Sequence, residues 1–427
     1  MSGTLKAVRG TRDLLPSETV LWNRIEATAR RVFARYNFGE IRTPVFEDTA
    51  LFARGVGEET DIVSKEMYTW EDRARAASEK TQSLTLRPEN TAGVVRAYIE
   101  HKLGETGQLQ KLYYIGPQFR RERPQKGRYR QFSQIGAEVI GPPSAGSESP
   151  LRDAEVLEML ATLLDELGIT GWTLHLNSVG SAADRARYNE VLRAALEPVA
   201  PKMCVDCQRR AVTNPLRVLD CKVPEDQPII EALPKIDEVL DEGSKQHFAA
   251  VLAALDAAGV PYERNLRLVR GLDYYTRTTF EFTHGGLGAQ NALLGGGRYD
   301  GLSEAIGGPK APGIGFAMGE DRLVLTLQAI EEPKAEKAEA YIAPLGESMN
   351  AAALALAREL RRAGLTVELG DGSFRLKKSF EAADKTAKRI VILGEDELAS
   401  GILTVKDFAR GEQKKVPRAE LKSALSS

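Results

Sequence analysis

Apolar residues recur at helical spacing near the start of the chain. Between Ser17 and Tyr36, the positions Leu21, Ile25 and Val32 fall on one face, and Pro16 precedes the segment. This spacing predicts an amphipathic helix that packs one side against a core. The next segment, Ile41 to Phe46, contains Pro44, which cannot donate to a central ladder. We therefore expect an edge or interface strand there.

Shorter runs of β-branched and aromatic residues follow between residues 83 and 140. The segments SLTLRP, LYYIGPQF and YRQFSQIGAEVIG are separated by turn residues. This pattern predicts strands joined by turns. A helix is predicted from Leu151 to Leu167, where Gly168 ends it, and another strand at WTLHLNS.

The pattern changes again near residue 181. Up to about residue 260 the chain is mostly helical and contains all three cysteines, which predicts an insertion into the larger domain. Strands are then expected at LRLVRGLDYY and TRTTFEF, followed by a glycine-rich turn and by a strand entering a helix at GIGFAMGEDRL. After the charged segment EEPKAEKAEA, strands and helices alternate in βαβαβ order and end in a hairpin, which predicts a mainly parallel sheet covered by helices.

These patterns predict an α+β fold, in which a large antiparallel sheet is flanked by helices and interrupted by a helical insertion, plus a C-terminal α/β domain. The expected boundaries are residues 1–180 for the first part of the large domain, 181–260 for the insertion, 261–330 for the second part, 331–340 for the linker, and 341–427 for the C-terminal domain.

Composition adds limits to this picture. The chain has 427 residues, of which 42% are hydrophobic, and its net charge is −2. Whole-chain charge gives no support for a nucleic-acid partner, so RNA contacts would have to come from local basic clusters. An apolar run of about 18 residues is missing, which argues against export and membrane spanning. Three cysteines do not make a disulfide framework, and we expect a cytoplasmic protein.

Several common catalytic signatures are missing from the sequence. It has no GxxxxGK[ST] and no GxGxxG after a strand, so neither a Walker phosphate loop nor a dinucleotide fold is indicated. HExxH and GxSxG are also absent, which argues against the commonest zinc proteases and serine hydrolases.

The strongest local signal is a basic loop between two predicted strands, GPQFRRERPQKGRYRQFSQIGAEVIG. Six like charges in one loop repel each other and favour nearby anions such as phosphates. The alternative is a solvated basic turn. Only Glu122 opposes the six, which are Arg120, Arg121, Arg123, Lys126, Arg128 and Arg130.

The segment FRRERPQKGRYRQF is similar to motif 2 of class II aminoacyl-tRNA synthetases, in the form found in the histidyl-tRNA synthetase family. LVRGLDYYTRTTFEF and LGGGRYDGL resemble two further motifs of that family, and GIGFAMGEDRL resembles class II motif 3. IRTPVFED fits motif 1, which forms the dimer interface in the class, so a homodimer is expected. The resemblance extends from AVRGTRDLLP to the C-terminal domain.

The resemblance implies that the chain activates histidine with ATP and transfers it to the terminal adenosine of tRNA(His). It places Arg120 on the α-phosphate, Glu122 at the adenine edge, Phe132 on the adenine ring and Arg322 at the γ-phosphate, with Arg128 as a further ATP ligand. Mg²⁺ would bridge the β- and γ-phosphates of the substrate.

Histidine has an ammonium, a carboxylate and two ring nitrogens, so its pocket needs acceptors, a cation and polar partners for the ring. The resemblance implies that Glu138 and Tyr275 meet the ring nitrogens. A strand-end carboxylate in a salt bridge is the alternative for Glu138. Further residues implied in the histidine pocket are Glu89, Thr91, Gln134, Tyr274 and Tyr299, and those implied at the tRNA acceptor end are Arg123 and Gln125.

Arg270 stands within an apolar segment, where an arginine is either paired or faces an anion. Pairing with Asp273 is one alternative. The resemblance implies instead that Arg270, with Arg120, is catalytic and bridges the α-phosphate and the histidine carboxylate. One departure concerns RPENT, where the family usually has glycine in place of Asn90. Asparagine tolerates positive φ better than most residues, so the turn is expected to survive.

Cys204 and Cys207 form a CxxC pair, and Cys221 follows. A structural zinc site usually has four ligands, but the chain has only three cysteines and no histidine close to them in sequence. This argues against structural zinc. We therefore predict no metal site, although the three cysteines could still approach one another. A basic cluster on one C-terminal helix predicts either an anticodon contact or a solubilising face. Its members are Arg375, Lys377, Lys378, Lys385, Lys388 and Arg389.

Two other functions stay open. Synthetase-like proteins can act as regulatory subunits in histidine biosynthesis, but these generally lack the anticodon-binding domain and lose motif residues. A class II synthetase for threonine, proline or glycine is the second alternative. LVRGLDYY, GGGRYDG and the lack of a clear editing insertion argue against it.

Overall fold

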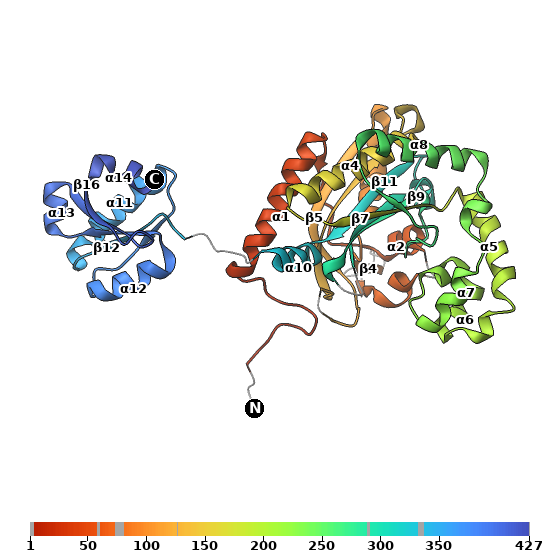
Figure 1. The fold of residues 1–427 in the computed structure, drawn as a ribbon, viewed down its shortest axis with the longest axis horizontal. Helices are drawn as coiled ribbons and strands as arrows, with labels where there is room; N and C mark the ends of the chain where they lie inside the picture. The colour runs from red at the N-terminus through yellow and green to blue at the C-terminus, as the bar shows by residue number, and fades with distance from the viewer. Residues whose placement is uncertain are drawn as a thin grey trace. The chain divides into compact units, whose positions relative to one another are not determined.

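The computed structural model describes residues 4–57, 60–72, 81–125, 127–287, 291–331 and 337–426. Lys126 of the basic loop and much of the predicted linker lie outside the described residues. The chain forms two compact units, residues 1–333 and 334–427, and each is described by itself (Figure 1). Across the described ranges, no helix combines the length and apolar character needed to cross a bilayer.

The first unit is built on an eight-stranded sheet, antiparallel except for its two outer pairs, β1 with β5 and β7 with β8. The antiparallel sheet predicted from the sequence is therefore confirmed. In spatial order the strands are β1 (Gly39–Glu40), β5 (Gln110–Phe119), β6 (Gln131–Ile140), β11 (Gly313–Gly319), β10 (Ala292–Arg298), β9 (Thr276–His284), β7 (Trp172–Ser178) and β8 (Glu263–Arg264).

Helices cover one face of this sheet. They are α1 (Pro16–Arg35), α4 (Pro150–Glu166), α8 (Glu242–Ala258) and α10 (Glu320–Ile330). Alternate residues of β6, such as Ile135 and Val139, belong to the apolar core beneath them. Because side chains alternate along a strand, Gln134 and Glu138 point to the opposite face. That face holds the candidate site.

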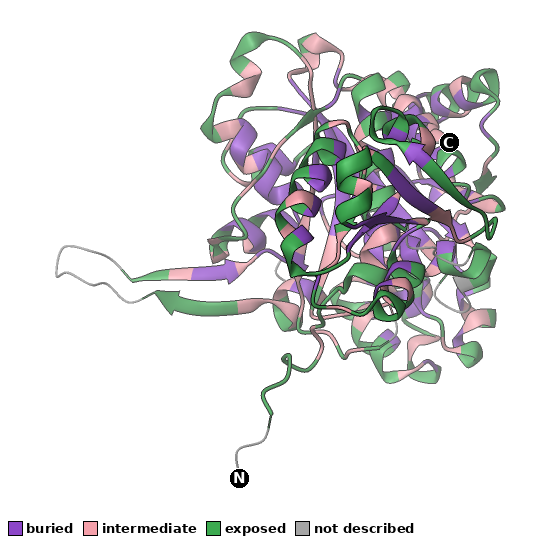
Figure 2. Cartoon of the chain, turned by 90° about the vertical axis from the view of Figure 1, so that its left-hand side faces the viewer, coloured by how far each residue is buried: buried purple, intermediate pink, exposed green. Residues whose placement is uncertain are grey.

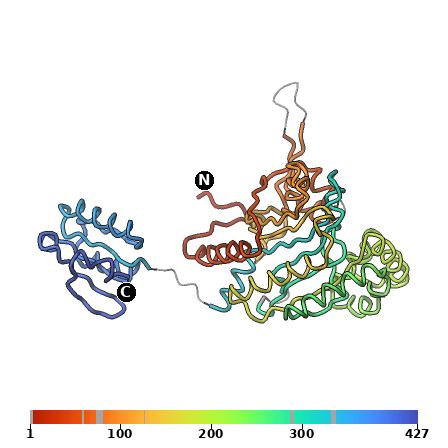
Figure 3. Tube along the Cα trace, turned by 90° about the horizontal axis from the view of Figure 1, so that it is seen from above, coloured from red at the N-terminus to blue at the C-terminus, as the bar shows by residue number. Residues whose placement is uncertain are grey.

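The insertion has its own apolar core, which includes Tyr188, Leu192 and Ile230. In contrast, Val251 and Leu255 of α8 pack into the core of the large sheet. The short elements of the insertion gather on one side of the unit (Figures 1 and 3). They include α5 (Ala182–Leu196), α6 (Val205–Thr213), the 3₁₀ turns η5 (Pro215–Asp220) and η6 (Pro224–Asp226), and α7 (Gln227–Glu231).

A three-stranded sheet carries β4 (Gln82–Leu86) between β2 (Phe46–Asp48) and β3 (Tyr68–Asp72). Strands β3 and β4 project from the unit (Figure 2). Helices α2 (Thr49–Val56) and α3 (Thr91–Glu100) follow β2 and β4. The strand predicted from Ile41 to Phe46 is mostly wrong, because β2 begins at Phe46. The carbonyls of Thr43 and Pro44 instead accept hydrogen bonds from Arg87, at 2.9 and 3.3 Å.

Two further predictions about local structure are wrong. The segment LRLVRGLDYY is irregular rather than a strand. The Asn177 side chain donates to the carbonyls of Leu266 and Leu268, at 3.3 and 3.0 Å, in place of a strand partner. The expected glycine-rich turn is instead the middle of β10, where Gly295–Gly297 pair with β9 on one side and β11 on the other.

The second unit confirms the predicted βαβαβ pattern and its hairpin. Strands β13 (Val367–Leu369), β12 (Ala340–Pro344) and β14 (Arg389–Leu393) are parallel, and β15 (Ile402–Asp407) and β16 (Gln413–Pro417) add an antiparallel hairpin. The helices are α11 (Asn350–Arg362), α12 (Leu376–Thr386), α13 (Glu395–Ser400) and α14 (Leu421–Ser426).

Candidate active site

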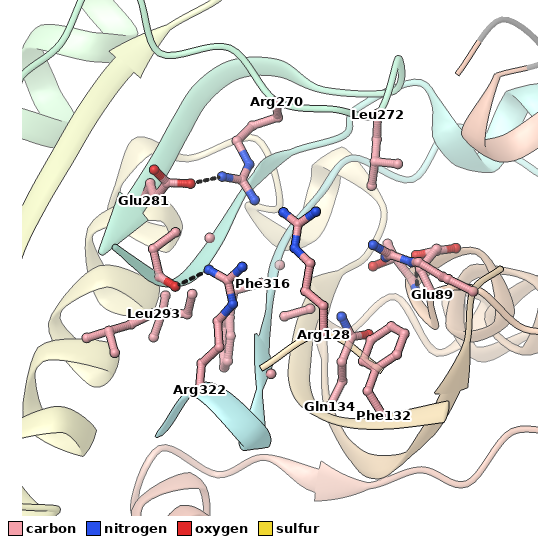
Figure 4. A pocket seen from close by; sticks show the side chains of 18 of the residues that line it. Glu89, Arg128, Phe132, Gln134, Arg270, Leu272, Glu281, Leu293, Phe316 and Arg322 are labelled. Carbon is pink, nitrogen blue, oxygen red and sulfur yellow. Dashed lines mark hydrogen bonds and ion pairs between the residues drawn. The ribbon is translucent and has the colours of Figure 1, made fainter. Parts of the chain in front are cut away.

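A cavity of about 310 Å³ opens on the face of the large sheet opposite α1, α4, α8 and α10. Figure 4 shows Arg128, Arg270 and Arg322 directed toward its middle. The predicted site residues that line this cavity are Glu89, Thr91, Arg120, Glu122, Arg128, Phe132, Gln134, Arg270, Tyr274, Tyr275, Tyr299 and Arg322.

Three predicted residues do not line the cavity. Glu138 is fully buried directly behind it, where it accepts a hydrogen bond from the Thr91 hydroxyl at 2.8 Å. Arg123 and Gln125 are exposed on the loop between β5 and β6. Glu138 is therefore separated from the cavity by its neighbour Thr91, whereas Arg123 and Gln125 face solvent.

Backbone carbonyls position two of the arginines. Arg120 follows β5, and its Nε donates to the Pro88 carbonyl at 2.8 Å, while its guanidinium lies 5.3 Å from the centre of the Phe132 ring. Arg322 lies in the first turn of α10, and its Nη1 donates to the Ala292 carbonyl at 2.6 Å. Burial lowers the pKa of Arg322. These carbonyl contacts orient both guanidinium groups without neutralising them. Arg120 Nη1 also lies 3.8 Å from Glu122 Oε1.

Arg270 pairs with Glu281 rather than with Asp273. Its Nη1 donates to Glu281 Oε1 at 2.6 Å, whereas Asp273 accepts from Asn214 at 3.2 Å. Burial alone would lower the pKa of Arg270, but the Glu281 carboxylate outweighs burial and raises it. Arg270 therefore lines the cavity as a cation whose guanidinium is oriented by Glu281.

The glycines of β10 make room for the side chains around the cavity. A Cβ on Gly295 would lie 2.6 Å from the Arg270 guanidinium carbon, and a Cβ on Gly297 would lie 2.8 Å from the Tyr275 ring. A Cβ on Gly315 of β11 would overlap a carboxylate oxygen of Glu138. Glycine at these positions lets charged and aromatic side chains lie flat against the sheet.

Two buried carboxylates belong to this site: Glu89 lines the cavity, and Glu138 lies behind the lining residue Thr91. Glu89 accepts hydrogen bonds from the backbone nitrogens of Thr91 and Ala92, at 2.8 and 3.0 Å, at the start of α3. Burial raises the pKa of Glu89. Burial also raises the pKa of Glu138 to about 8, although the nearby Tyr299 and Thr91 hydroxyls act in the other direction.

Asn90 stands between Glu89 and Thr91 in the RPENT segment. Its φ is −119°, so the positive φ that we considered for it is not required. Its side-chain oxygen accepts a hydrogen bond from the Thr43 hydroxyl at 2.6 Å. Asparagine therefore fits this turn without backbone strain.

Three tyrosines form the wall nearest Glu138. The Tyr274 ring centre lies 4.7 Å from that of Tyr275 and 6.0 Å from that of Tyr299. Several buried polar atoms around the site meet no hydrogen-bond partner within the described chain, among them Gln134 Oε1, Glu138 Oε2, Tyr299 Oη and Arg270 Nε. Buried polar groups are rarely left unpaired, so this cavity suits a polar ligand.

Sequence reasoning missed several residues around the site. Glu281 lies in the same LVRGLDYYTRTTFEF segment as Arg270, but its pairing with that arginine shows only in the folded chain. Arg298 of GGGRYDG is fully buried, and its Nε donates to Asp153 at 2.7 Å. Arg12 from the N-terminal segment donates to Asp321 at 2.9 Å, beside Arg322. Their partners are distant in sequence, so no local pattern could reveal these pairs.

The basic cluster of the second unit is mostly solvent-exposed. Arg389 is an exception, because it pairs with Asp407 at 2.9 Å and donates to the Leu425 carbonyl at 2.7 Å. It therefore belongs to the domain's own structure. The exposed members are Arg375, Lys377, Lys378, Lys385 and Lys388.

Comparison with known proteins decides the family. Residues 10–323 match the family model described as histidyl-tRNA synthetase. The chain belongs to the histidyl-tRNA synthetase family. Residues 339–427 match the model described as an anticodon binding domain, which fits the α/β unit at the C-terminus.

Close relatives within the histidyl-tRNA synthetase family cover almost all of the chain. A histidine–tRNA ligase of Koribacter versatilis is 74% identical over 418 residues, covering 98% of this chain and 95% of the relative. A histidine–tRNA ligase of Solibacter usitatus is 56% identical over 425 residues, covering 99% of each.

Solved structures agree with this assignment. Apo S. aureus histidyl-tRNA synthetase is 38% identical with a TM-score of 0.80, covering 99% of this chain and 100% of that one. A Bacillus halodurans C protein described as an ATP phosphoribosyltransferase regulatory subunit/histidyl-tRNA synthetase has a TM-score of 0.66 at 20% identity, covering 92% of this chain and 99% of that one. At that identity the likeness concerns the fold alone, so the fold does not separate a ligase from a regulatory subunit.

Proposed function

We propose that this chain is a histidine–tRNA ligase, which activates histidine with ATP and transfers it to the terminal adenosine of tRNA(His). The observation that carries this proposal is a single cavity whose lining combines Arg120, Arg270 and Arg322 with carboxylates and tyrosines. Cations suit the phosphates of ATP, and acidic and aromatic groups suit a small cationic amino acid.

The first step is attack by a histidine carboxylate oxygen on the α-phosphorus of ATP. The bond to the β-phosphate oxygen breaks, and pyrophosphate leaves. Arg270 and Arg120 stabilise the charge that grows on the α-phosphate, and Arg322 holds the γ-phosphate. Such transfers depend mainly on positioning and fixed charge. Phe132 offers a flat face to adenine, with Glu122 and Arg128 beside it. Mg²⁺ enters as part of the ATP substrate.

In the second step, a hydroxyl of the terminal adenosine attacks the activated carbonyl carbon. The ester forms, and AMP leaves. The exposed residues Arg123 and Gln125 are our candidates for contact with the tRNA acceptor end, because they extend from the loop beside the cavity. The exposed lysines of α12 are candidates for contact with the anticodon.

Selection of histidine rests on the acidic and aromatic groups of this site. Glu138 and Tyr275 would bind the two ring nitrogens, while Glu89, Thr91 and Gln134 would bind the ammonium, beside Tyr274 and Tyr299. Glu138 Oε2 and Gln134 Oε1 lack hydrogen-bond partners within the described residues, which supports this role. A site of this kind rejects ligands without matching groups by about 10⁴–10⁵, because its polar groups would stay unpaired.

We also propose that the chain is a class II synthetase that works as a cytoplasmic homodimer. Apolar side chains are exposed in and beside the motif 1 segment: its Val45 and Phe46 are 40% and 49% exposed, and Trp70 of β3 is 40% exposed. Phe46 and Trp70 form an edge-to-face pair with ring centres 6.1 Å apart. A second copy covering this patch would remove it from water.

Amino-acid-dependent ATP–pyrophosphate exchange tests the proposal, with each protein amino acid supplied in turn. We expect exchange with histidine alone, followed by charging of tRNA(His). Exchange with threonine, proline or glycine would overturn the specificity. No exchange with any amino acid would favour the regulatory-subunit alternative.

A further inference from the structure

Four potential metal ligands meet inside the helical insertion. Cys204 immediately precedes α6, Cys207 lies in its first turn, Cys221 follows η5, and Asp226 ends η6. One ligand atom from each residue lies within 4.8 Å of all the others. Three segments that are separated in sequence thus bring three thiols and a carboxylate to one point.

The spacing of these atoms matches tetrahedral zinc. Cys204 Sγ lies 3.9 Å from Cys221 Sγ, and Cys221 Sγ lies 3.3 Å from Asp226 Oδ2. Zn–S and Zn–O bonds of about 2.3 and about 2.0 Å at tetrahedral angles give ligand separations of about 3.8 and about 3.5 Å. A central ion therefore fits with only small movements.

Three of the four groups are buried, and no ion pair to Asp226 is found among the described residues. Cys207 is 0% exposed, Asp226 1% and Cys221 6%. The hydrogen bonds to Asp226 within the described chain come from the Cys204 backbone nitrogen, at 3.1 Å, and from the Cys221 thiol. A buried carboxylate is costly unless it is paired or binds a metal.

Backbone groups orient two of the ligands. The Cys204 nitrogen donates to Asp226, and the Val223 nitrogen donates to Cys221 Sγ at 3.4 Å. Hydrogen bonds of this kind fix the direction in which a metal ligand points.

We propose that Cys204, Cys207, Cys221 and Asp226 bind one zinc ion in a closed, structural site. The sequence argued against zinc because only cysteines and histidines were counted as ligands. Asp226 supplies the fourth ligand, and its place becomes visible only in the fold. Three thiolates with one carboxylate favour zinc over magnesium or calcium, which prefer oxygen ligands alone.

The zinc would stabilise the part of the insertion that supports the Arg270 segment. Gln227 donates to the Cys221 carbonyl at 2.9 Å and accepts from Arg267 at 2.8 Å, three residues before Arg270. Asn214, which follows α6, donates to Asp273. Loss of the ion would therefore loosen contacts on both flanks of Arg270.

Metal analysis of the full-length chain, purified under reducing conditions with zinc supplied, tests this inference. We expect about one zinc per chain in the parent, a loss of most of it in Asp226→Ala and Cys207→Ser, and a lower thermal midpoint when a chelator removes it. Asp206→Ala is the matched control, because Asp206 is an exposed aspartate of α6, the helix that contains Cys207. It should keep its zinc.

Cobalt(II) supplies a second readout. Bound in place of zinc, it should give a thiolate-to-metal charge-transfer band in the parent that is lost in Cys207→Ser. If Asp226→Ala does not fold, Asp226→Asn carries the test and should release zinc to a chelator at least about tenfold faster. A parent with almost no zinc and no cobalt band, a Cys204–Cys221 disulfide in its place, or full zinc retention by the Asp226 variant would overturn the proposal.

Discussion

Arg270 Nη1 and Glu281 Oε1 lie 2.6 Å apart inside the cavity, although the two residues come from an irregular segment and from β9. Each side chain is about a quarter exposed, at 24% and 25%. Glu281 also faces Gly295 across the β9–β10 pairing. The carboxylate, the guanidinium and this glycine, which has no side chain, therefore lie together. Four predictions concern this site, and a fifth concerns the C-terminal domain.

Removing the carboxylate should destabilise the fold moderately. Glu281→Gln leaves Arg270 without its counter-charge, and because the pair is partly solvated we expect a loss of about 1–2 kcal/mol in unfolding free energy. Urea unfolding measures it. Glu263→Gln, at a 67% exposed side chain on β8 of the same sheet, is the control and should change little. Equal stability of the two variants would show that Glu281 does not hold Arg270.

Adding one methyl group to β10 should displace Arg270. In Gly295→Ala the new Cβ would meet the guanidinium at 2.6 Å, so the guanidinium must move. We expect the histidine-dependent exchange rate to fall by about 10², since small misplacements of this size have that effect. Gly301→Ala is the control from the same motif, because its Cβ would meet nothing within 4 Å. Unchanged exchange in Gly295→Ala would contradict the geometry.

Glu138 should make the stability of the unliganded chain depend on pH. Its pKa is about 8 in the folded chain against an ordinary 4.5. Between these values the folded chain binds a proton that the unfolded chain releases, so the stability of the folded state falls as pH rises from about 4.5 to about 8. Glu138→Gln cannot titrate and should lose this part of the dependence.

Urea unfolding at several pH values compares Glu138→Gln with the parent chain. The variant's unfolding free energy should gain on the parent's as pH rises through this window. Glu100→Gln, at an exposed glutamate, should follow the parent. Parallel curves for parent and Glu138→Gln would mean that Glu138 is already ionised near neutral pH.

The lysines of the second unit should affect tRNA but not activation. Replacing Lys377, Lys385 and Lys388 together by alanine removes three exposed charges, and we expect kcat/KM for tRNA charging to fall about tenfold with a weaker salt dependence. ATP–pyrophosphate exchange should stay unchanged. The control is the triple alanine variant of Lys414, Lys415 and Lys422, also exposed. Equal losses of charging efficiency in both triple variants would show that tRNA responds to the net charge of the domain and not to these three lysines.

Patterns within one segment predicted their elements well. The helix that became α1, the strands β5 and β6, and the alternating C-terminal domain follow from local periodicity. The prediction of a strand around Arg270 was wrong because Asn177 satisfies carbonyls of that segment from another strand. The glycines of β10 were taken for a turn because the side chains that need their space are distant in sequence.

The residues of the candidate site also fall into two groups, those that local motifs identify and those that only the fold brings together. Motif residues such as Arg120 and Arg322 could be named from the sequence, and they line the cavity. The partners Glu281 and Asp153, and the ligand Asp226, could not be named, because each meets its neighbours only after the sheet and insertion have formed. Pairing across a fold leaves no local signal when only one sequence is read.

Arg270→Ala tests the central claim most directly, by histidine-dependent ATP–pyrophosphate exchange. The account predicts a rate at least about 10² lower than that of the parent, because a fixed cation is removed from the α-phosphate as its charge grows. Arg264→Ala, at a half-exposed arginine six residues earlier, should retain the parent rate. A folded Arg270→Ala variant that exchanges at the parent rate would contradict the account.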